Sequence, residues 1–183
     1  MILTARIENV MKELIEGLEE DNDFVLGNPE APHTIVEFVN FQCPSCLNSS
    51  YMIGQLVRAL KDDVKVIFKF LPNVDEYPNS MICANAAAAA GEQGKFWEMH
   101  DCLFRAQKQL DLTAILRIAN MLELDMEKFN EDLDSDKIHR LVNKHYMQGK
   151  SLGVVDTPTF FIDGKRHDRG WSYNSLLNTV YSN

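Results

Sequence analysis

Two cysteines separated by two residues, Cys43-Pro44-Ser45-Cys46, are the side chains whose types and spacing best suit chemistry. If a helix begins here, Cys43 lies at its N-terminus, where free backbone N–H groups and the helix dipole favour an anion. The thiolate is the nucleophilic form of cysteine, so this position activates it. Pro44 suits the first helical turn because its missing N–H has no intrahelical partner there. We therefore predict that a partly exposed Cys43 attacks disulfides and that a largely buried Cys46, one turn further on, resolves the mixed disulfide.

The main alternative for this motif is a structural zinc site, of which a CxxC pair supplies half. The other half would come from Cys83, His100 and Cys102, but these form no second closely spaced pair of the kind that zinc sites use. We therefore expect no metal and no cofactor beyond the dithiol itself. If residues 81–90 and 95–105 are antiparallel helices, Cys83 and Cys102 lie at equal height along the hairpin. They then form a possible second disulfide, which we expect only in an oxidising environment.

Glu37 is an acidic residue in an otherwise apolar segment, six residues before Cys43. The alternation of a strand points it the same way as Ile35 and Val39, into the protein. A buried carboxyl holds its proton to raised pH, so Glu37 is a candidate catalytic group that exchanges a proton with Cys46. Two other interpretations stay open, in which Glu37 faces solvent or pairs with Lys69 on the neighbouring strand.

The elements that must position these residues follow an α/β order. A buried strand over 34–39, a helix over 47–60 and a strand over 64–71 form a right-handed unit with parallel strands. The carboxyl edge of such a sheet, where the CxxC falls, is where open α/β folds place their chemistry. Helical spacing continues over 79–152, a hairpin follows at 159–162 and 165–167, and a last helix covers 172–180. The predicted domains are an N-terminal amphipathic helix in 1–23, a sheet domain in 24–78 and 153–183, and a helical insertion in 79–152.

Composition narrows the possible partners. The chain has 183 residues and a net charge of −9, which argues against nucleic acid and anionic membrane surfaces. No run approaches the apolar length of a membrane helix, so we expect no membrane insertion. The first residues do not resemble a signal peptide. We expect a cytoplasmic protein as the chain stands, or a periplasmic or extracellular one if an export signal was removed. The stripe at Leu3, Ile7, Val10 and Leu14 leaves an oligomer through residues 2–20 open, although docking onto the chain's own sheet is the preferred interpretation.

Together with the CxxC and Glu37, several segments resemble the DsbA-like branch of the thioredoxin superfamily. These segments are residues 25–32, 36–43, 94–101 and 157–164. The resemblance implies a thioredoxin fold with an inserted helical domain, to which the apolar spacing of residues 2–20 adds an extra N-terminal helix. It also implies a cis peptide bond before Pro158 beside the CxxC, with substrate bound by Thr157, Pro158, Pro44 and Ser45. Strongly oxidising members have Pro-His where this chain has Pro-Ser, so the direction of the exchange stays open between oxidase, isomerase and reductase.

The leading hypothesis is a protein disulfide oxidoreductase. Its substrates would be protein thiols or disulfides, and its redox partner another protein or glutathione. One alternative is a client-binding, holdase-like module with incidental thiols, for which Phe41, Gln42 and Val155 would form part of an apolar surface. Another is a glutathione-dependent isomerase or transferase on the same fold.

Overall fold

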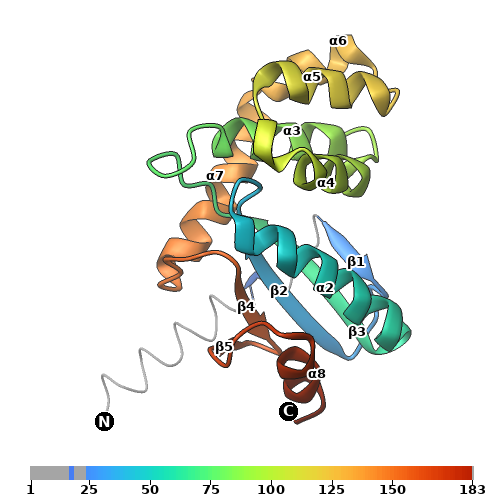
Figure 1. The fold of residues 1–183 in the computed structure, drawn as a ribbon, viewed down its shortest axis with the longest axis vertical. Helices are drawn as coiled ribbons and strands as arrows, with labels where there is room; N and C mark the ends of the chain where they lie inside the picture. Colours follow the sequence, from blue (N-terminus) through green and yellow to red (C-terminus); the bar gives the residue numbers. More distant parts are fainter. Residues whose placement is uncertain (1–16, 19–23, 183) are drawn as a thin grey trace. The chain divides into compact units, whose positions relative to one another are not determined.

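The computed structural model of the protein describes residues 17–18 and 24–182 (Figure 1). The helix expected over residues 2–20, and any oligomer contact through it, therefore lies almost entirely outside the described residues. One member of that helix that is described, Leu18, is fully buried. The chain divides into two compact units. One is built from the described residues among 1–38, 48–69 and 148–183, and the other from 39–47 and 70–147.

The first unit contains a five-stranded sheet with the order β1-β3-β2-β4-β5. The strands are β1 (Val25–Gly27), β2 (His33–Val39), β3 (Val64–Phe70), β4 (Thr159–Ile162) and β5 (Lys165–His167). β1 pairs with β3, and β4 with both β2 and β5, in antiparallel fashion. The neighbours β2 and β3 are joined through helix α2 (Pro44–Leu60) and a short 3-10 helix, η1 (Lys61–Asp63).

The hairpin between β4 and β5 turns at Asp163 and Gly164, as the sequence predicts. Both residues have positive φ values, 45° and 75°, which an Asp-Gly pair accepts more readily than most dipeptides. The Asp163 carboxylate also accepts a hydrogen bond from the Thr34 backbone N–H at 2.8 Å and contacts His33 Nδ1 at 2.9 Å. The turn is thereby fastened to the start of β2.

One face of this sheet is covered by α2 and by the last helix, α8 (Tyr173–Ser182). The side chains of this core are buried and apolar: Ile35, Met52, Ile53, Leu56, Leu60, Val64, Val66, Phe160, Ile162, Leu176 and Val180. Because Glu37 alternates with Ile35 along β2, its side chain also points toward α2. A carboxyl is therefore placed on the apolar face of the sheet, under the helix that begins just after Cys43.

The helices of the second unit include one, α3 (Ser80–Gly91), that is almost entirely buried. They are α3 (Ser80–Gly91), α4 (Phe96–Arg105), the 3-10 helix η2 (Gln107–Gln109), α5 (Leu112–Met121), α6 (Met126–Leu133) and α7 (Asp136–Ser151), whose end belongs to the first unit. Every residue from 84 to 90 in α3 is buried, Asn85 included, and α4 and α6 both pack against this helix. Small side chains allow this close approach. None of the helices in the described residues combines the length and apolar character that a bilayer crossing requires.

The boundaries of the two units differ from those proposed from the sequence. Residues 39–47, which include the CxxC, and residues 70–78 group with the helices instead of the sheet. The reason lies in the contacts of Phe41 and Gln107 described below, which join the segment around the CxxC to α4 and η2.

Candidate active site

The segment that carries the CxxC is a tight turn between β2 and α2. Asn40, directly after β2, accepts two hydrogen bonds in this turn. Its backbone oxygen accepts from the Cys43 N–H at 3.1 Å, and its side-chain Oδ1 accepts from the Gln42 N–H at 3.0 Å. Helix α2 begins at Pro44, so Cys43 stands immediately before the first helical residue. This is the position expected from the sequence, where the helix N-terminus stabilises a thiolate.

The two cysteines differ in their access to solvent. Cys43 is 7% exposed and Cys46 is fully buried, while Pro44 between them is exposed and Ser45 is half-buried. Both thiols are in the reduced form. The order of exposure agrees with the roles assigned from the sequence, but Cys43 is more buried than the partly exposed residue expected there. Phe41, two residues earlier in the same turn, is buried as well.

Alkylation of the reduced, folded protein is expected to modify Cys43 before the other three thiols. Cys102 has a similar exposed fraction, 9%, but burial raises the pKa of its thiol and leaves less of the reactive thiolate. Cys46 and Cys83 are fully buried. Peptide mapping by mass spectrometry after brief exposure to iodoacetamide measures the order. First labelling of Cys46 would reverse the roles of the two CxxC thiols.

Gln107, on the 3-10 helix η2, holds the backbone of the turn. Its Nε2 donates to the carbonyl oxygens of Phe41, at 2.8 Å, and of Cys43, at 2.9 Å, across 64 residues of sequence in the second case. The ring of Phe41 packs on Phe104 of α4, with 5.1 Å between the ring centroids. Phe41 is only 1% exposed, so the expectation that it contributes to an exposed apolar surface is wrong. The aromatic side chains of α4 take it into the core.

Replacing Gln107 with alanine is expected to lower the free energy of unfolding by about 1–3 kcal/mol, because the carbonyls of Phe41 and Cys43 both lose a donor. Chemical unfolding measures this loss, and Gln109→Ala, an exposed glutamine two residues further along η2, is the matched control. The rate at which Cys43 is alkylated as a function of pH should also change, since the turn that positions it is loosened. Equal stability and equal pH profiles for the two variants would exclude a positioning role for Gln107.

Glu37 is buried, with 4% of its surface exposed, which rules out the interpretation that it faces solvent. The hydroxyl of Ser49 on α2 donates a hydrogen bond to Glu37 Oε1 at 2.9 Å. Burial raises the pKa of Glu37 from 4.5 to about 7, and the hydrogen bond from Ser49 opposes this shift only in part. Ser49 follows Cys46 by three residues on α2, so both side chains occupy one face of the helix. Lys69, which the sequence offers as an alternative partner for Glu37, is fully buried on β3.

Tyr77 has an ionisation that responds to the charge of the dithiol, which the sequence does not reveal. Partial burial, a hydrogen bond to Glu76 and the negative charge of the Cys43 and Cys46 thiolates together raise the pKa of Tyr77 to about 12. The phenol therefore lies within electrostatic range of the dithiol and keeps its proton at neutral pH. No spacing or pattern in the segment before α3 could have singled it out.

The Thr157–Pro158 peptide bond is cis, the isomer expected from the family resemblance. It lies immediately before β4, where Thr159 Oγ1 donates to the Asp156 carbonyl at 2.7 Å. Val155 nearby is 70% exposed. Substrate binding by Thr157 and Pro158, and by Pro44 and Ser45, stays a prediction.

Cys83 and Cys102 lie on α3 and α4, two helices that pack against each other, and both are free thiols. Burial raises the pKa of Cys83 to about 12. Burial also raises the pKa of Cys102, and a thiol with a raised pKa is a poor nucleophile near neutral pH. Their pairing under oxidising conditions stays a prediction. In the part of the chain that the structure describes, no three His, Cys, Asp or Glu side chains are grouped so that they could hold a metal ion.

Comparison with known proteins shows the family to which the chain belongs. A family model described as thioredoxin matches residues 19–181. The chain is 35% identical over 170 residues to a Na(+)/H(+) antiporter, NhaA 3, from Salinispora tropica; the match covers 93% of this chain and 26% of the antiporter. The chain thus spans about a quarter of the length of the curated relatives it matches first.

Two solved structures extend the comparison. A thioredoxin-like oxidoreductase from Silicibacter pomeroyi has 28% identity and a TM-score of 0.78, over 91% of this chain and 95% of that one. The thiol–disulfide exchange protein alpha-DsbA2 from Wolbachia pipientis has 24% identity and a TM-score of 0.82, over 97% of both chains. The chain belongs to the thioredoxin family and has the fold of its DsbA-like thiol–disulfide oxidoreductases.

Proposed function

We propose that the protein is a thiol–disulfide oxidoreductase that exchanges disulfides with protein thiols through Cys43 and Cys46. The observation that carries the proposal is the arrangement of the two thiols at the start of α2. Cys43 precedes the first helical residue and retains some exposure, while Cys46 is fully buried one turn further on. An attacking thiol must reach its substrate, whereas a resolving thiol needs only to reach the first.

The exchange starts from the reduced dithiol. The Cys43 thiolate attacks one sulfur of a substrate disulfide, so that a mixed disulfide forms and the other substrate sulfur leaves as a thiolate. Cys46 then loses its proton and attacks Cys43 Sγ. The Cys43–Cys46 disulfide forms and the second substrate sulfur leaves. Two electrons pass from the dithiol to the substrate, and the reverse sequence oxidises a substrate dithiol.

Glu37 is the group proposed to take the proton from Cys46. A carboxyl whose pKa is about 7 is close to evenly divided between its protonated and ionised forms at neutral pH, so it accepts and returns a proton readily. Ser49 fixes the orientation of this carboxyl through its hydroxyl. Ser49 and Cys46 share a face of α2, which supports a connection between the carboxyl and the resolving thiol.

The reduction of insulin by dithiothreitol tests the proposal, because the released chains precipitate and scatter light. An oxidoreductase shortens the delay before turbidity appears. A holdase-like module binds the exposed chains and delays turbidity instead. Acceleration at catalytic amounts of the protein therefore supports the proposal, and a lasting suppression would contradict it.

A further inference from the structure

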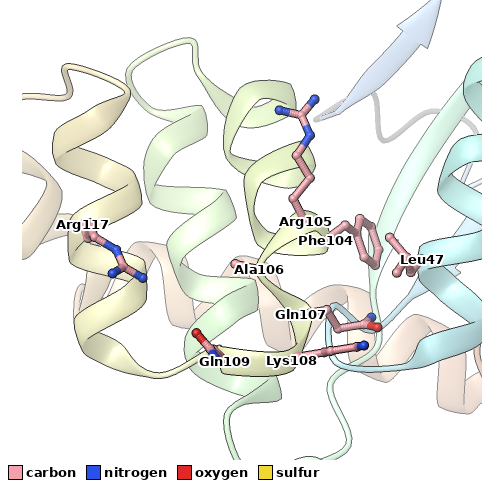
Figure 2. A pocket seen from close by; sticks show the side chains of 8 residues that line it. All are labelled: Leu47, Phe104, Arg105, Ala106, Gln107, Lys108, Gln109 and Arg117. Atoms are coloured by element: carbon pink, nitrogen blue, oxygen red, sulfur yellow. The ribbon is translucent and has the colours of Figure 1, made fainter.

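A hollow with a volume of about 350 Å³ lies beside the active-site turn, within the second unit (Figure 2). Its wall is formed by the end of α4, by η2 and by α5, together with Leu47 of α2. Three of its eight lining residues are basic, Arg105, Lys108 and Arg117, and none is acidic. Since the whole chain carries a net charge of −9, the sign of the charge at this hollow is opposite to that of the protein.

The basic side chains are available to a ligand. Arg105 contacts Asp101 at 3.8 Å, but both side chains are more than half exposed, and such pairs contribute little. Within the described part of the chain, neither Lys108 nor Arg117 has an ion-pair partner. Figure 2 shows the Lys108 side chain extending along η2 toward the start of α2, with Arg117 at the other end of the hollow above Gln109.

Gln107 connects this hollow to the reacting cysteine. It lines the hollow and, through Nε2, donates to the Cys43 carbonyl oxygen at 2.9 Å. Leu47, also in the wall, is one helical turn after Cys43, and its N–H donates to the same carbonyl at 3.4 Å. A residue of extended peptide spans about 3.3–3.6 Å. A substrate whose sulfur joins Cys43 can therefore place a side chain a few residues away into the hollow.

We propose that this hollow is a subsite for a carboxylate that the thiol or disulfide substrate carries close to its reacting sulfur. The inference rests on the proposed function, and it assigns that function a preference for acidic substrates. Arginine and lysine are the donors that carboxylates pair with most strongly, and arginine presents a planar fork that matches both carboxylate oxygens. The volume, near the lower end of those of ligand sites, accommodates one or two side chains. The carboxylate belongs to an acidic residue of a polypeptide or to glutathione.

The test compares exchange rates of peptide disulfides that differ only in one residue near the cysteine, which is glutamate, glutamine or lysine. For the wild-type protein at low salt, the glutamate peptide is expected to react about three- to tenfold faster than the glutamine peptide, and the lysine peptide more slowly still. In the double variant Lys108→Gln, Arg117→Gln, the ratio of the glutamate to the glutamine rate should fall toward one. Arg140→Gln is the control, since Arg140 is 75% exposed on α7 and does not line the hollow.

A second arm uses glutathione disulfide in place of the peptides. A slower reaction of the double variant with glutathione disulfide but not with the glutamate peptide identifies glutathione as the source of the carboxylate, and the converse identifies a polypeptide. Equal rates for all three peptides with the wild-type protein, together with an unchanged glutathione rate in the double variant, would overturn the inference. Failure to react with any disulfide at all, neutral peptides included, would instead contradict the proposed function.

Discussion

Replacing Cys43 with serine is expected to reduce catalysed insulin reduction to the background rate, a loss of at least about 10³-fold. A serine hydroxyl does not ionise near neutral pH and forms no mixed disulfide, so the first step of the exchange cannot begin. Cys46 cannot substitute for it, because its side chain is fully buried and out of reach of a protein substrate. The turbidity assay described above measures the loss.

Cys102→Ser is the matched control for this variant. It removes a thiol of similar exposure from the same unit, but one whose pKa is raised by burial. The control is expected to keep the activity of the wild-type protein. If Cys43→Ser accelerated turbidity as well as the control does, the thiols would be incidental.

Replacing Glu37 with glutamine is expected to stabilise the protein above neutral pH. Glutamine keeps an oxygen that accepts the hydrogen bond of Ser49, and it cannot ionise. In the wild-type protein burial raises the pKa of Glu37 to about 7, from an ordinary value of 4.5. A carboxyl with a raised pKa favours folding while it holds its proton. This contribution to stability is complete at pH values below the pKa of Glu37 in the unfolded chain. It is lost as the pH rises through the pKa of Glu37 in the folded protein.

The wild-type protein and the Glu37→Gln variant should therefore have equal free energies of unfolding at low pH. These free energies should diverge between about pH 4.5 and 7. At about pH 8 the variant should be the more stable by up to about 3 kcal/mol, because one pKa unit corresponds to about 1.4 kcal/mol. Urea unfolding at a series of pH values measures this, with Glu30→Gln, an exposed carboxylate, as the control. If Glu37 instead formed an ion pair with Lys69, the variant would be less stable than the wild-type protein at high pH. Such a result would contradict the role of Glu37 as a proton acceptor.

The same variant separates stability from catalysis. If Glu37 takes the proton of Cys46, Glu37→Gln should slow the resolution of the mixed disulfide even at a pH where the variant is more stable than the wild type. A gain in stability accompanied by unchanged turnover would leave Glu37 as a buried carboxyl without a part in the exchange.

Much of the sheet could be predicted from the sequence because the pattern of apolar residues within each strand is enough to indicate it. The strand expected over 34–39 is observed as His33–Val39, that expected over 64–71 as Val64–Phe70, and the hairpin at 159–162 and 165–167 is observed at those residues. Apolar runs bounded by turn residues fix such elements within the strand itself. The inward orientation of Glu37 followed from the same alternation.

The contacts that complete the site could not be predicted, because they join distant segments. Gln107 reaches the Cys43 carbonyl from a short 3-10 helix, and nothing in its neighbourhood marks it as different from Gln109. Ser49 could be placed on the face of Cys46 by helical spacing, but its bond to Glu37 depends on which face of the sheet α2 covers. Phe41 was misassigned to the surface for the same reason. An aromatic residue in a turn has no local signal that α4 will bury it.

The role of the dithiol is tested by a titration of the reduced protein against mixtures of reduced and oxidised glutathione, followed by alkylation and peptide mass spectrometry. Two thiols should be lost together, the lost pair should be Cys43 and Cys46, and they should be joined in one intramolecular disulfide. The midpoint of this transition then gives the reduction potential and the direction of the exchange, with a value near about −270 mV indicating a reductase. If Cys43 and Cys46 stay reduced across the titration, or are modified singly by glutathione without ever joining, the protein does not exchange disulfides through this pair.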